Sequence, residues 1–153
     1  MNALTIPQKL DIIELWMLTF PQVECALEHH FTPGLYSRQI FNPKGTFIIT
    51  KTHKTEHQFV ISKGKLSIWT EDDGVKTVSA PYFGITKPGT RRLIFSHEDT
   101  VFTTFHANPD NETDIAKLEE VLIEHNPPKL LGVDLASLQP EKVVVQLLNG
   151  GTP

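Results

Sequence analysis

Two histidines four residues apart, His53 and His57, are the residues of this sequence best suited to hold a metal ion. They occur in the stretch THKTEHQFVISKGKLSIW, residues 52–69, with Glu56 between them and a strand-like run after them. Imidazole binds zinc, iron, nickel and copper, and non-heme iron sites commonly combine two histidines with a carboxylate. Both histidines can reach one ion if they lie on adjacent strands across a tight turn, or on one face of an irregular strand. The alternative is a polar pocket without metal.

A metal site needs a third ligand, and His106 is the strongest candidate. The segment RRLIFSHEDTVFTTFHA predicts a hairpin that turns near Ser96–Asp99, and its register would place His106 opposite Gly89–Arg91. We therefore predict that the three histidines hold a divalent transition metal: Zn, Fe, Ni or Mn. The reserve ligands are Glu56, His29 and His30. Since neighbouring residues of a strand point to opposite faces, at most one of the two adjacent histidines would point inward.

Three arginines form a second group that points to ligand binding: Arg38, Arg91 and Arg92. An arginine in a barrel strand is costly unless it is paired or faces water. If Arg91 or Arg92 points into the mouth of a barrel, its guanidinium can clamp a carboxylate or a phosphate. Tyr36 shares a strand face with Arg38 by alternation and would join the same site. The alternative is a solvated strand face with salt bridges to acidic residues: Glu71, Asp72 or Glu98.

The middle of the chain, residues 22–107, supplies short strands that would position these side chains. The strand-like runs are QVECAL, LYSRQIF, GTFIITKTH, HQFVIS, KLSIWTE, VKTVSA, YFGIT, RRLIFS and TVFTTFHA. Many short strands separated by glycine and proline turns indicate a β-sandwich or barrel. Alternation such as Phe59 and Ile61 indicates that each strand has one buried face and one wet face.

Helices are expected on both sides of the strand region. Thr5 is a plausible N-cap for a helix over residues 6–19, whose apolar stripe we expect to pack on the barrel. A second helix is predicted over residues 113–124, with its start signal at Thr113. The later segment LASLQPEKVVVQLLN is ambiguous, and its run of valines favours a short strand or a segment that packs on a partner.

The stretch from Gly45 to Gly64 resembles the first sequence motif of the cupin superfamily. That motif has a glycine, two histidines one residue apart, a glutamate and a closing glycine. Counting back from Gly64 puts His57 in the glutamate position and His53 in the position of the second histidine, while Lys51 occupies that of the first. The departure of two ligand positions argues against standard dioxygenase chemistry.

A later stretch, GITKPGTRRLIF, is similar in outline to the second cupin motif. Gly84 and the Pro88-Gly89 turn match, whereas Arg91-Arg92 occupy the region of the expected histidine. The resemblance covers about residues 34–107. The whole sequence is also similar to small cupin-like proteins of tailed bacteriophages, through phrases such as HHFTPGLYSRQIF and THKTEH.

The resemblance implies a mainly β, single-domain cupin-type double-stranded β-helix, or jelly roll. Its parts would be an N-terminal helix within residues 1–21, a barrel over residues 22–107, and a C-terminal helix and tail over residues 108–153. Jelly rolls commonly form symmetric pairs that bury apolar surface, so we expect a homodimer.

Length and charge exclude several classes of protein. The 153 residues suit one domain, and the net charge of −4 offers no basic stripe for nucleic acid. The longest apolar stretch, LDIIELWMLTF, is too short and too charged to span a bilayer, so no membrane partner is expected. The N-terminal residues lack the pattern of a signal peptide, and the one cysteine, Cys25, fits a reducing cytoplasm, that of the host if the chain is phage-encoded.

Three functions remain open from the sequence. The first is a metal-dependent protein that acts on a small, anionic molecule. The second is a module that binds or sequesters such a molecule without turnover. The third is a structural or interaction protein of a phage that uses the jelly roll as a scaffold. We favour a metal-binding cupin-like protein of unassigned reaction, although a shared fold does not fix function.

Overall fold

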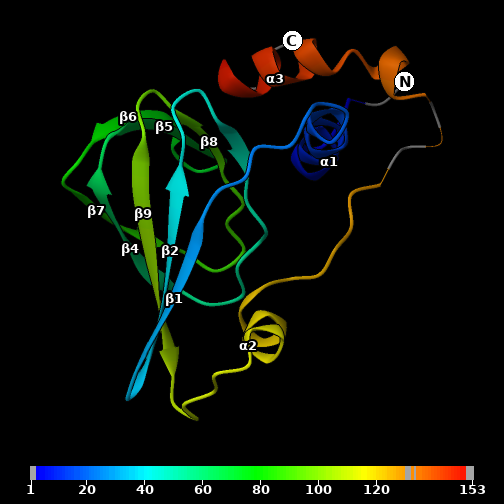
Figure 1. The fold of residues 1–153 in the computed structure, drawn as a ribbon. Coiled ribbons are helices and arrows are strands. Elements are labelled where there is room, and N and C mark those ends of the chain that lie inside the picture. The colour runs from blue at the N-terminus through cyan, green and yellow to red at the C-terminus, as the bar shows by residue number, and fades with distance from the viewer. Residues whose placement is uncertain (1–2, 130–131, 133, 151–153) are drawn as a thin grey trace. The chain divides into compact units, whose positions relative to one another are not determined.

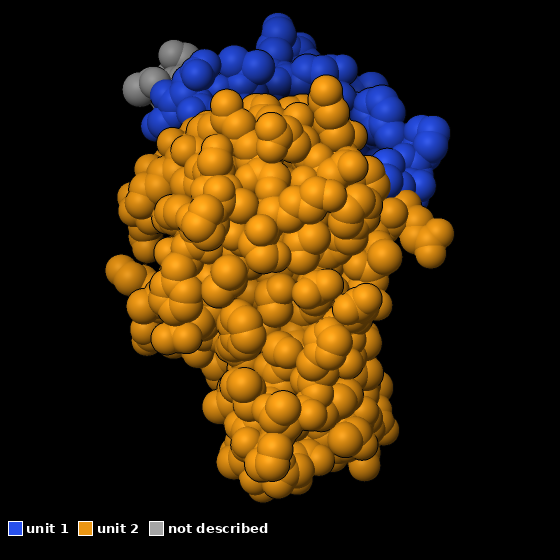
Figure 2. Space-filling model, turned by 60° about the vertical axis from the view of Figure 1, so that its left-hand side comes forward, with its two compact units in different colours: residues 1–23, 126–153 blue, residues 24–125 orange. Residues whose placement is uncertain are grey.

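The computed structural model describes residues 3–129, 132 and 134–150, and the chain divides into two compact units that Figure 2 colours differently. The larger unit spans residues 24–125. The smaller unit combines residues 1–23 with residues 126–153. All of the histidines and arginines considered above belong to the larger unit.

The larger unit is built from two antiparallel sheets, which confirms the predicted mainly β architecture (Figure 1). One sheet has the strand order β1-β2-β9-β4-β7 and the other has the order β3-β8-β5-β6. The strands are β1 (Leu27–Thr32), β2 (Gly34–Asn42), β3 (Phe47–Ile49), β4 (His57–Lys63), β5 (Lys65–Thr70), β6 (Gly74–Ser79), β7 (Tyr82–Thr86), β8 (Leu93–Ser96) and β9 (Thr100–Asn108).

Apolar side chains from both sheets form the core of this unit. The main cluster of buried residues consists of Phe59, Ile61, Leu66, Ile68, Ile94 and Phe102. Strands β4 and β9 belong to the first sheet, and β5 and β8 to the second, so this cluster joins the two layers. A smaller cluster forms where Leu118 and Leu122 of helix α2 (Ile115–Leu122) pack on Tyr36.

The first strand differs from its prediction. The run QVECAL was expected to form a strand, but β1 begins only at Leu27 and continues to Thr32. The reason lies in the turn at Pro33-Gly34, where Gly34 adopts a φ of 75°. That turn sets the register in which Thr32 pairs with Leu35, and the pairing continues back as far as Leu27 and Ile40. Turn geometry thus decides the strand limits more than local hydrophobicity does.

The predicted N-terminal helix is confirmed as α1 (Ile6–Met17), which ends two residues earlier than expected. The side chains of Thr5 and Gln8 each accept a hydrogen bond from the other's backbone N–H, which fixes the start of the helix. Within the smaller unit, α1 packs against α3 (Pro140–Leu148) and the 3-10 helix η1 (Leu135–Leu138). Packing of the helix on the barrel stays a prediction.

Two predictions about the C-terminal segments were wrong in detail. Helix α2 is capped by Asp114, not Thr113, because the Asp114 carboxylate accepts bonds from the N–H groups of Ala116 and Lys117. The valine-rich run, for which a short strand was one of the two expectations, is helix α3, in which Val143 and Leu147 are buried one turn apart. Their four-residue spacing supplies an apolar stripe, and this tertiary packing overrides the β preference of valine. The other expectation, a segment that packs on a partner, stays a prediction.

Gly64, between β4 and β5, gives a test of the packing that fixes these strands. Its φ is 90°, and a Cβ there would collide with the Asp99 carbonyl oxygen and lie 2.8 Å from Thr100 Cγ2. Gly45 has a similar φ of 83°, but a Cβ there meets nothing within 4 Å.

We predict that Gly64→Ala destabilises the protein more than Gly45→Ala does. Both substitutions place alanine in the left-handed region at a cost of about 1–2 kcal/mol, and Gly64→Ala adds a steric cost of roughly 1–3 kcal/mol. Urea unfolding of both variants and the parent protein measures the difference. Equal losses of stability would contradict the close approach at Gly64.

Candidate metal and ligand site

The imidazole rings of three histidines from separate parts of the chain lie next to one another inside the larger unit. The ring centres of His53 and His57 lie 4.5 Å apart, those of His57 and His106 also lie 4.5 Å apart, and those of His53 and His106 lie 6.0 Å apart. His57 and His106 are buried, and His53 is partly buried. The structure therefore brings together the three side chains that the sequence singled out as metal ligands.

Strand pairing places two of the three imidazoles. Strand β4 pairs with β9 in a register that sets Gln58 opposite Phe105, which brings the adjoining His57 and His106 side by side. This differs from the predicted hairpin. Strand β8 pairs with β3 and β5 in the other sheet, so it does not pair with β9, and His106 lies across from Tyr36 of β2.

Backbone hydrogen bonds hold His53 in a loop before β4. The His53 carbonyl accepts a bond of 2.8 Å from the N–H of Gly89, next to the Pro88-Gly89 turn. On its other side, His53 forms an isolated β-bridge with Ile123, just after α2. The Lys54 N–H donates to the Leu122 carbonyl at 2.9 Å. The end of α2 thus fixes the loop that carries the first histidine.

One nitrogen of each imidazole is buried and has no hydrogen-bond partner: His53 Nδ1, His57 Nε2 and His106 Nδ1. The other nitrogens of two rings are engaged. His57 Nδ1 lies 3.1 Å from the Thr55 carbonyl oxygen, so that nitrogen carries the proton and Nε2 keeps a lone pair. His106 Nε2 lies 2.9 Å from Thr104 Oγ1. Metal-binding histidines characteristically use their second nitrogen in this way.

Burial keeps the three imidazoles neutral. It lowers the pKa of His53 to about 3, with smaller effects from the neighbouring His57 and Arg92. Burial lowers the pKa of His106 to about 3 as well, again with a smaller effect from His57. The pKa of His57 is also lowered, chiefly by burial. Neutral imidazole is the form that binds a metal ion.

The ring separations fit a shared ion, but the donor atoms do not yet converge. An ion about 2.1 Å from each nitrogen, at tetrahedral angles, would place imidazole centres about 5 Å apart. The observed separations bracket that value. Among the described residues, however, no group of three or more His, Cys, Asp or Glu side chains is arranged to hold a metal as it stands.

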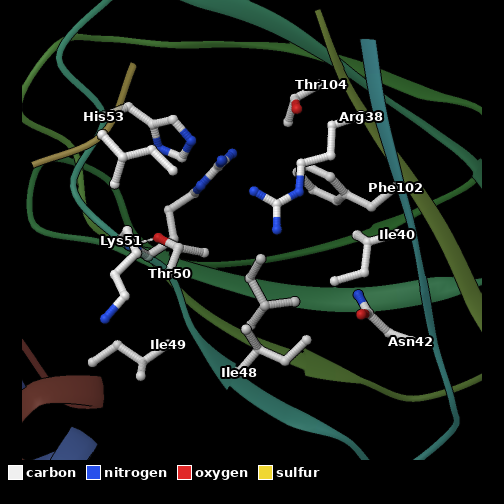
Figure 3. Close-up of a pocket in the computed structure, with 13 residues that line it drawn as sticks. Arg38, Ile40, Asn42, Ile48, Ile49, Thr50, Lys51, His53, Phe102 and Thr104 are labelled. Atoms are coloured by element: carbon white, nitrogen blue, oxygen red, sulfur yellow. Dashed lines mark hydrogen bonds between the residues drawn. The ribbon is translucent and has the colours of Figure 1, made fainter. Parts of the chain in front are cut away.

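A cavity of about 220 Å³ adjoins the histidine cluster through His53 (Figure 3). Its lining is Arg38, Ile40, Asn42, Ile48, Ile49, Thr50, Lys51, His53, Arg92, Ile94, Phe102, Thr104 and Ile123. Figure 3 shows the side chains of Arg38 and His53 directed into it. This lining contains three cationic residues and no aspartate or glutamate, so the cavity favours an anion.

Arg92 is the buried cation of this cavity. It is 3% exposed, and its guanidinium carbon lies 5.1 Å and 5.2 Å from the ring centres of Phe59 and Phe102, a cation–π arrangement. Burial lowers its pKa to about 10, so it stays charged at neutral pH. Its Nε and Nη1 atoms have no hydrogen-bond partner. An anion would satisfy these donors and offset the buried charge.

The structure separates the remaining ligand-binding candidates. Arg38 lines the cavity and makes a long ion pair of 3.9 Å with Glu119. Arg91 does not line it and instead donates from Nε to the Thr50 carbonyl at 3.3 Å. Glu56 is exposed in the loop between the two first histidines.

Tyr36 and His29 lie beside the cluster and outside the cavity lining. Tyr36 is buried, its ring stacks 5.7 Å from that of His106, and its hydroxyl lies 2.7 Å from His29 Nδ1. His30, which follows His29 in the sequence, is exposed, and its Nε2 lies 3.3 Å from the Glu28 carboxylate. Of the two adjacent histidines, one therefore turns toward the site, as alternation predicts.

Four polar residues near the site were missed from the sequence: Asn42, Thr50, Thr86 and Thr104. Asn42 is 1% exposed, and its Oδ1 has no hydrogen-bond partner. Thr86 lies opposite His57 in the pairing of β7 with β4, and its hydroxyl has no hydrogen-bond partner either. Strand alternation could have found two of them. Asn42 follows Arg38 at a four-residue interval, and Thr104 precedes His106 by two residues.

Comparison with known protein families and with curated proteins found no match for this chain. Solved structures share its fold. One is an uncharacterized conserved protein with a double-stranded beta-helix domain from Klebsiella pneumoniae, with a TM-score of 0.50 and 16% identity, over 61% of this chain and 85% of that one. A weaker likeness, to a cupin-2 domain containing protein from Shewanella frigidimarina, has a TM-score of 0.46 and 12% identity, over 62% of this chain and 91% of that one.

A larger enzyme contains the same fold. Salicylate 1,2-dioxygenase from Pseudaminobacter salicylatoxidans matches 73% of this chain and 34% of its own length, with a TM-score of 0.53 and 10% identity. At such identities the likeness shows the fold alone. The chain has the double-stranded β-helix, or jelly-roll, fold that the resemblance to the two cupin motifs implied.

Of the remaining expectations from the sequence, the structure bears only on the membrane. In the described part of the chain no helix has both the length and the apolar character needed to cross a membrane. The likeness to phage proteins, the homodimer and the cytoplasmic location stay predictions.

Burial of neutral histidines predicts a loss of stability in mild acid. The folded-state pKa values of His53 and His106, about 3, lie below the ordinary value of 6.5. Between those two pH values the unfolded chain binds more protons than the folded protein does. The free energy of unfolding is therefore highest above about pH 6.5 and declines as the pH falls toward 3. At pH 5, each of these two histidines lowers the free energy of unfolding by about 2 kcal/mol relative to its value above pH 6.5.

The test is urea unfolding of metal-free protein between pH 7.5 and 5. His106→Gln should flatten the dependence on pH, because it removes one of the titrating groups. His30→Gln, at an exposed site, should leave the dependence as it is in the parent protein. A parent protein equally stable at both ends of this range would contradict the burial of neutral imidazoles.

Proposed function

We propose that this protein binds one divalent transition metal through His53, His57 and His106, and holds a small anionic molecule in the adjoining cavity. The observation that carries the proposal is the set of three buried imidazole nitrogens without hydrogen-bond partners, one from each ring. Unmet buried nitrogens are costly, and a shared ligand for all three removes that cost.

The three free nitrogens, and the groups that bond the opposite nitrogens of two rings, favour a metal over a water-filled polar pocket. The Thr55 carbonyl and the Thr104 hydroxyl engage the nitrogens that would face away from an ion. The low pKa values leave lone pairs available at neutral pH. The separations of the three ring centres also suit a shared ion.

The positive charge of the site is the reason for proposing an anionic ligand. Arg92 lies close enough to lower the pKa of all three histidines, and a bound metal would add further positive charge. No acidic side chain lines the cavity in the described chain. An anionic ligand would supply the missing negative charge and accept hydrogen bonds from the Arg92 guanidinium.

A bound metal would supply Lewis-acid chemistry or activate water or oxygen. The chain's own residues would orient the ligand by Arg92 and Arg38 and restrict water through the isoleucines of the cavity wall. Binding without turnover is the second candidate function. It is favoured by the surroundings of the cluster, because His57 occupies the glutamate position of the motif and Glu56, the carboxylate next to it in the sequence, is exposed.

We predict that the purified, untagged protein, reconstituted with Zn, Fe, Ni or Mn, retains about one ion per chain after desalting. His57→Ala and His106→Ala should each lower the metal affinity at least about ten-fold, because each removes a ligand. Elemental analysis by mass spectrometry, with competing chelators for affinity, measures both.

His30→Ala is the matched control, because His30 is an exposed histidine of the neighbouring strand β1. It should bind metal as the parent protein does. Retention below about a tenth of an ion per chain after reconstitution with all four metals would contradict the proposal, as would equal affinity in the three variants.

We also predict that Arg92→Met weakens the binding of small carboxylates at least about ten-fold, since hydrogen bonds to a charged group are worth roughly 1.5–3 kcal/mol. Arg91→Met is the matched control, because the neighbouring guanidinium does not line the cavity. Thermal shifts across a panel of carboxylates and inorganic phosphate measure the effect. A parent protein that responds to none of them would contradict the anion site.

A further inference from the structure

The cavity wall changes from polar to apolar and back to polar along strand β2. Arg38, Ile40 and Asn42 follow one another at two-residue intervals on its inward face, and all three line the cavity (Figure 3). Inward residues of a strand are about 6.6 Å apart, so Arg38 and Asn42 lie about 13 Å apart at their Cα atoms. The cavity therefore has two polar ends separated by an apolar middle.

Strand pairing extends the same order across both sheets. In the first sheet Arg38 pairs with Thr104, and Ile40 pairs with Phe102. In the facing sheet Ile48 pairs with Ile94. All of these residues line the cavity. The middle of the cavity thus has hydrocarbon from both sheets, at Ile40, Ile48 and Ile94, beside the Phe102 ring that the Arg92 guanidinium covers, and this wall suits a short apolar body next to a charged group.

The two polar ends make different demands on a ligand. Near the Arg38 end, the Arg92 guanidinium lies over the rings of Phe59 and Phe102, and Phe59 pairs with Thr104, the strand partner of Arg38. Two buried nitrogen atoms of Arg92, Nε and Nη1, have no partners. At the other end, Asn42 is 1% exposed and its side-chain Oδ1 is likewise unpartnered. A carboxylate would accept bonds from Arg92, and a hydroxyl would donate to Oδ1, or accept from the amide if it is flipped. Both features point to one extended ligand.

We propose that the cavity takes a short organic carboxylate whose hydrocarbon body ends in a second hydrogen-bonding group, such as an ω-hydroxy acid. The carboxylate lies at Arg92, with Arg38 beside it. The body lies between the isoleucines, and the terminal hydroxyl meets Asn42. A volume of about 220 Å³ limits the body to a few carbons. The inference rests on the proposed anion site, and it adds the length and the second end of the ligand.

The test uses metal-free protein and four probes in ligand-observed NMR titrations. The probes are hexanoate, ω-hydroxyhexanoate, the amide of ω-hydroxyhexanoic acid, and inorganic phosphate. ω-Hydroxyhexanoate should bind the parent protein about ten-fold more tightly than hexanoate, because the hydroxyl satisfies a buried polar atom. The neutral amide and phosphate should bind more weakly than either carboxylate.

Asn42→Leu should abolish the preference for the hydroxylated acid and leave hexanoate binding intact. Asn42→Ala serves the same purpose if leucine is too large, and Asn149→Ala, at an exposed position, is the control. Equal binding of the two acids by the parent protein would overturn this inference while the proposed anion site stands. Equal binding of phosphate and hexanoate would also overturn it. Failure of every carboxylate to bind would overturn this inference, and failure of phosphate as well would overturn both proposals.

Discussion

Buried hydrogen-bonding atoms without partners are the constraint on which this site depends. In most proteins such atoms are few, because each costs about 1–3 kcal/mol of stability. Here they include nitrogen atoms of three histidines, two atoms of Arg92, and oxygens of Asn42 and Thr86. They gather at the histidine cluster and along the cavity beside it, which is where a ligand would meet them. The apolar core between the two sheets must stabilise the fold against their cost.

The residues at this site differ from those of the cupin sequence motifs that parts of the chain resemble. Two motif positions for metal ligands hold Lys51 and the Arg91-Arg92 pair. The structure gathers its imidazoles differently, with His57 in the motif's glutamate position and His106 from β9. Arg92 then places a buried positive charge next to a cluster of neutral donors. Metal and anion would be linked in this arrangement, because the anion offsets positive charge from both.

Periodicity and turn signals in the sequence were sufficient to predict most of the strands and the first helix. Pairing was harder. The sequence favoured a hairpin of the last two strands, but the two lie in different sheets, since the jelly roll pairs β9 with β2 and β4. His106 therefore reaches the cluster by a different route from the one predicted. Long-range pairing depends on the whole sheet and leaves little trace in any single segment.

The candidate site was predictable in its residue types and less so in its details. His53, His57 and Arg92 stand out because of their chemistry and their place in motif-like stretches. Asn42 does not, because an asparagine at the end of a strand is usually a turn residue. Alternation from Arg38 places it on the inward face of the strand, and the register of β2 and β9 then shows that it is buried in the cavity wall. Burial depends on what lies opposite a residue, and local sequence does not encode that.

The most direct test of the central claim is a crystal structure of the metal-reconstituted protein, with data collected at the absorption edge of the metal. The account predicts one anomalous peak about 2.0–2.2 Å from a nitrogen of each of His53, His57 and His106. A cluster without any peak, whose three free nitrogens bond only to water or to protein groups, would contradict it.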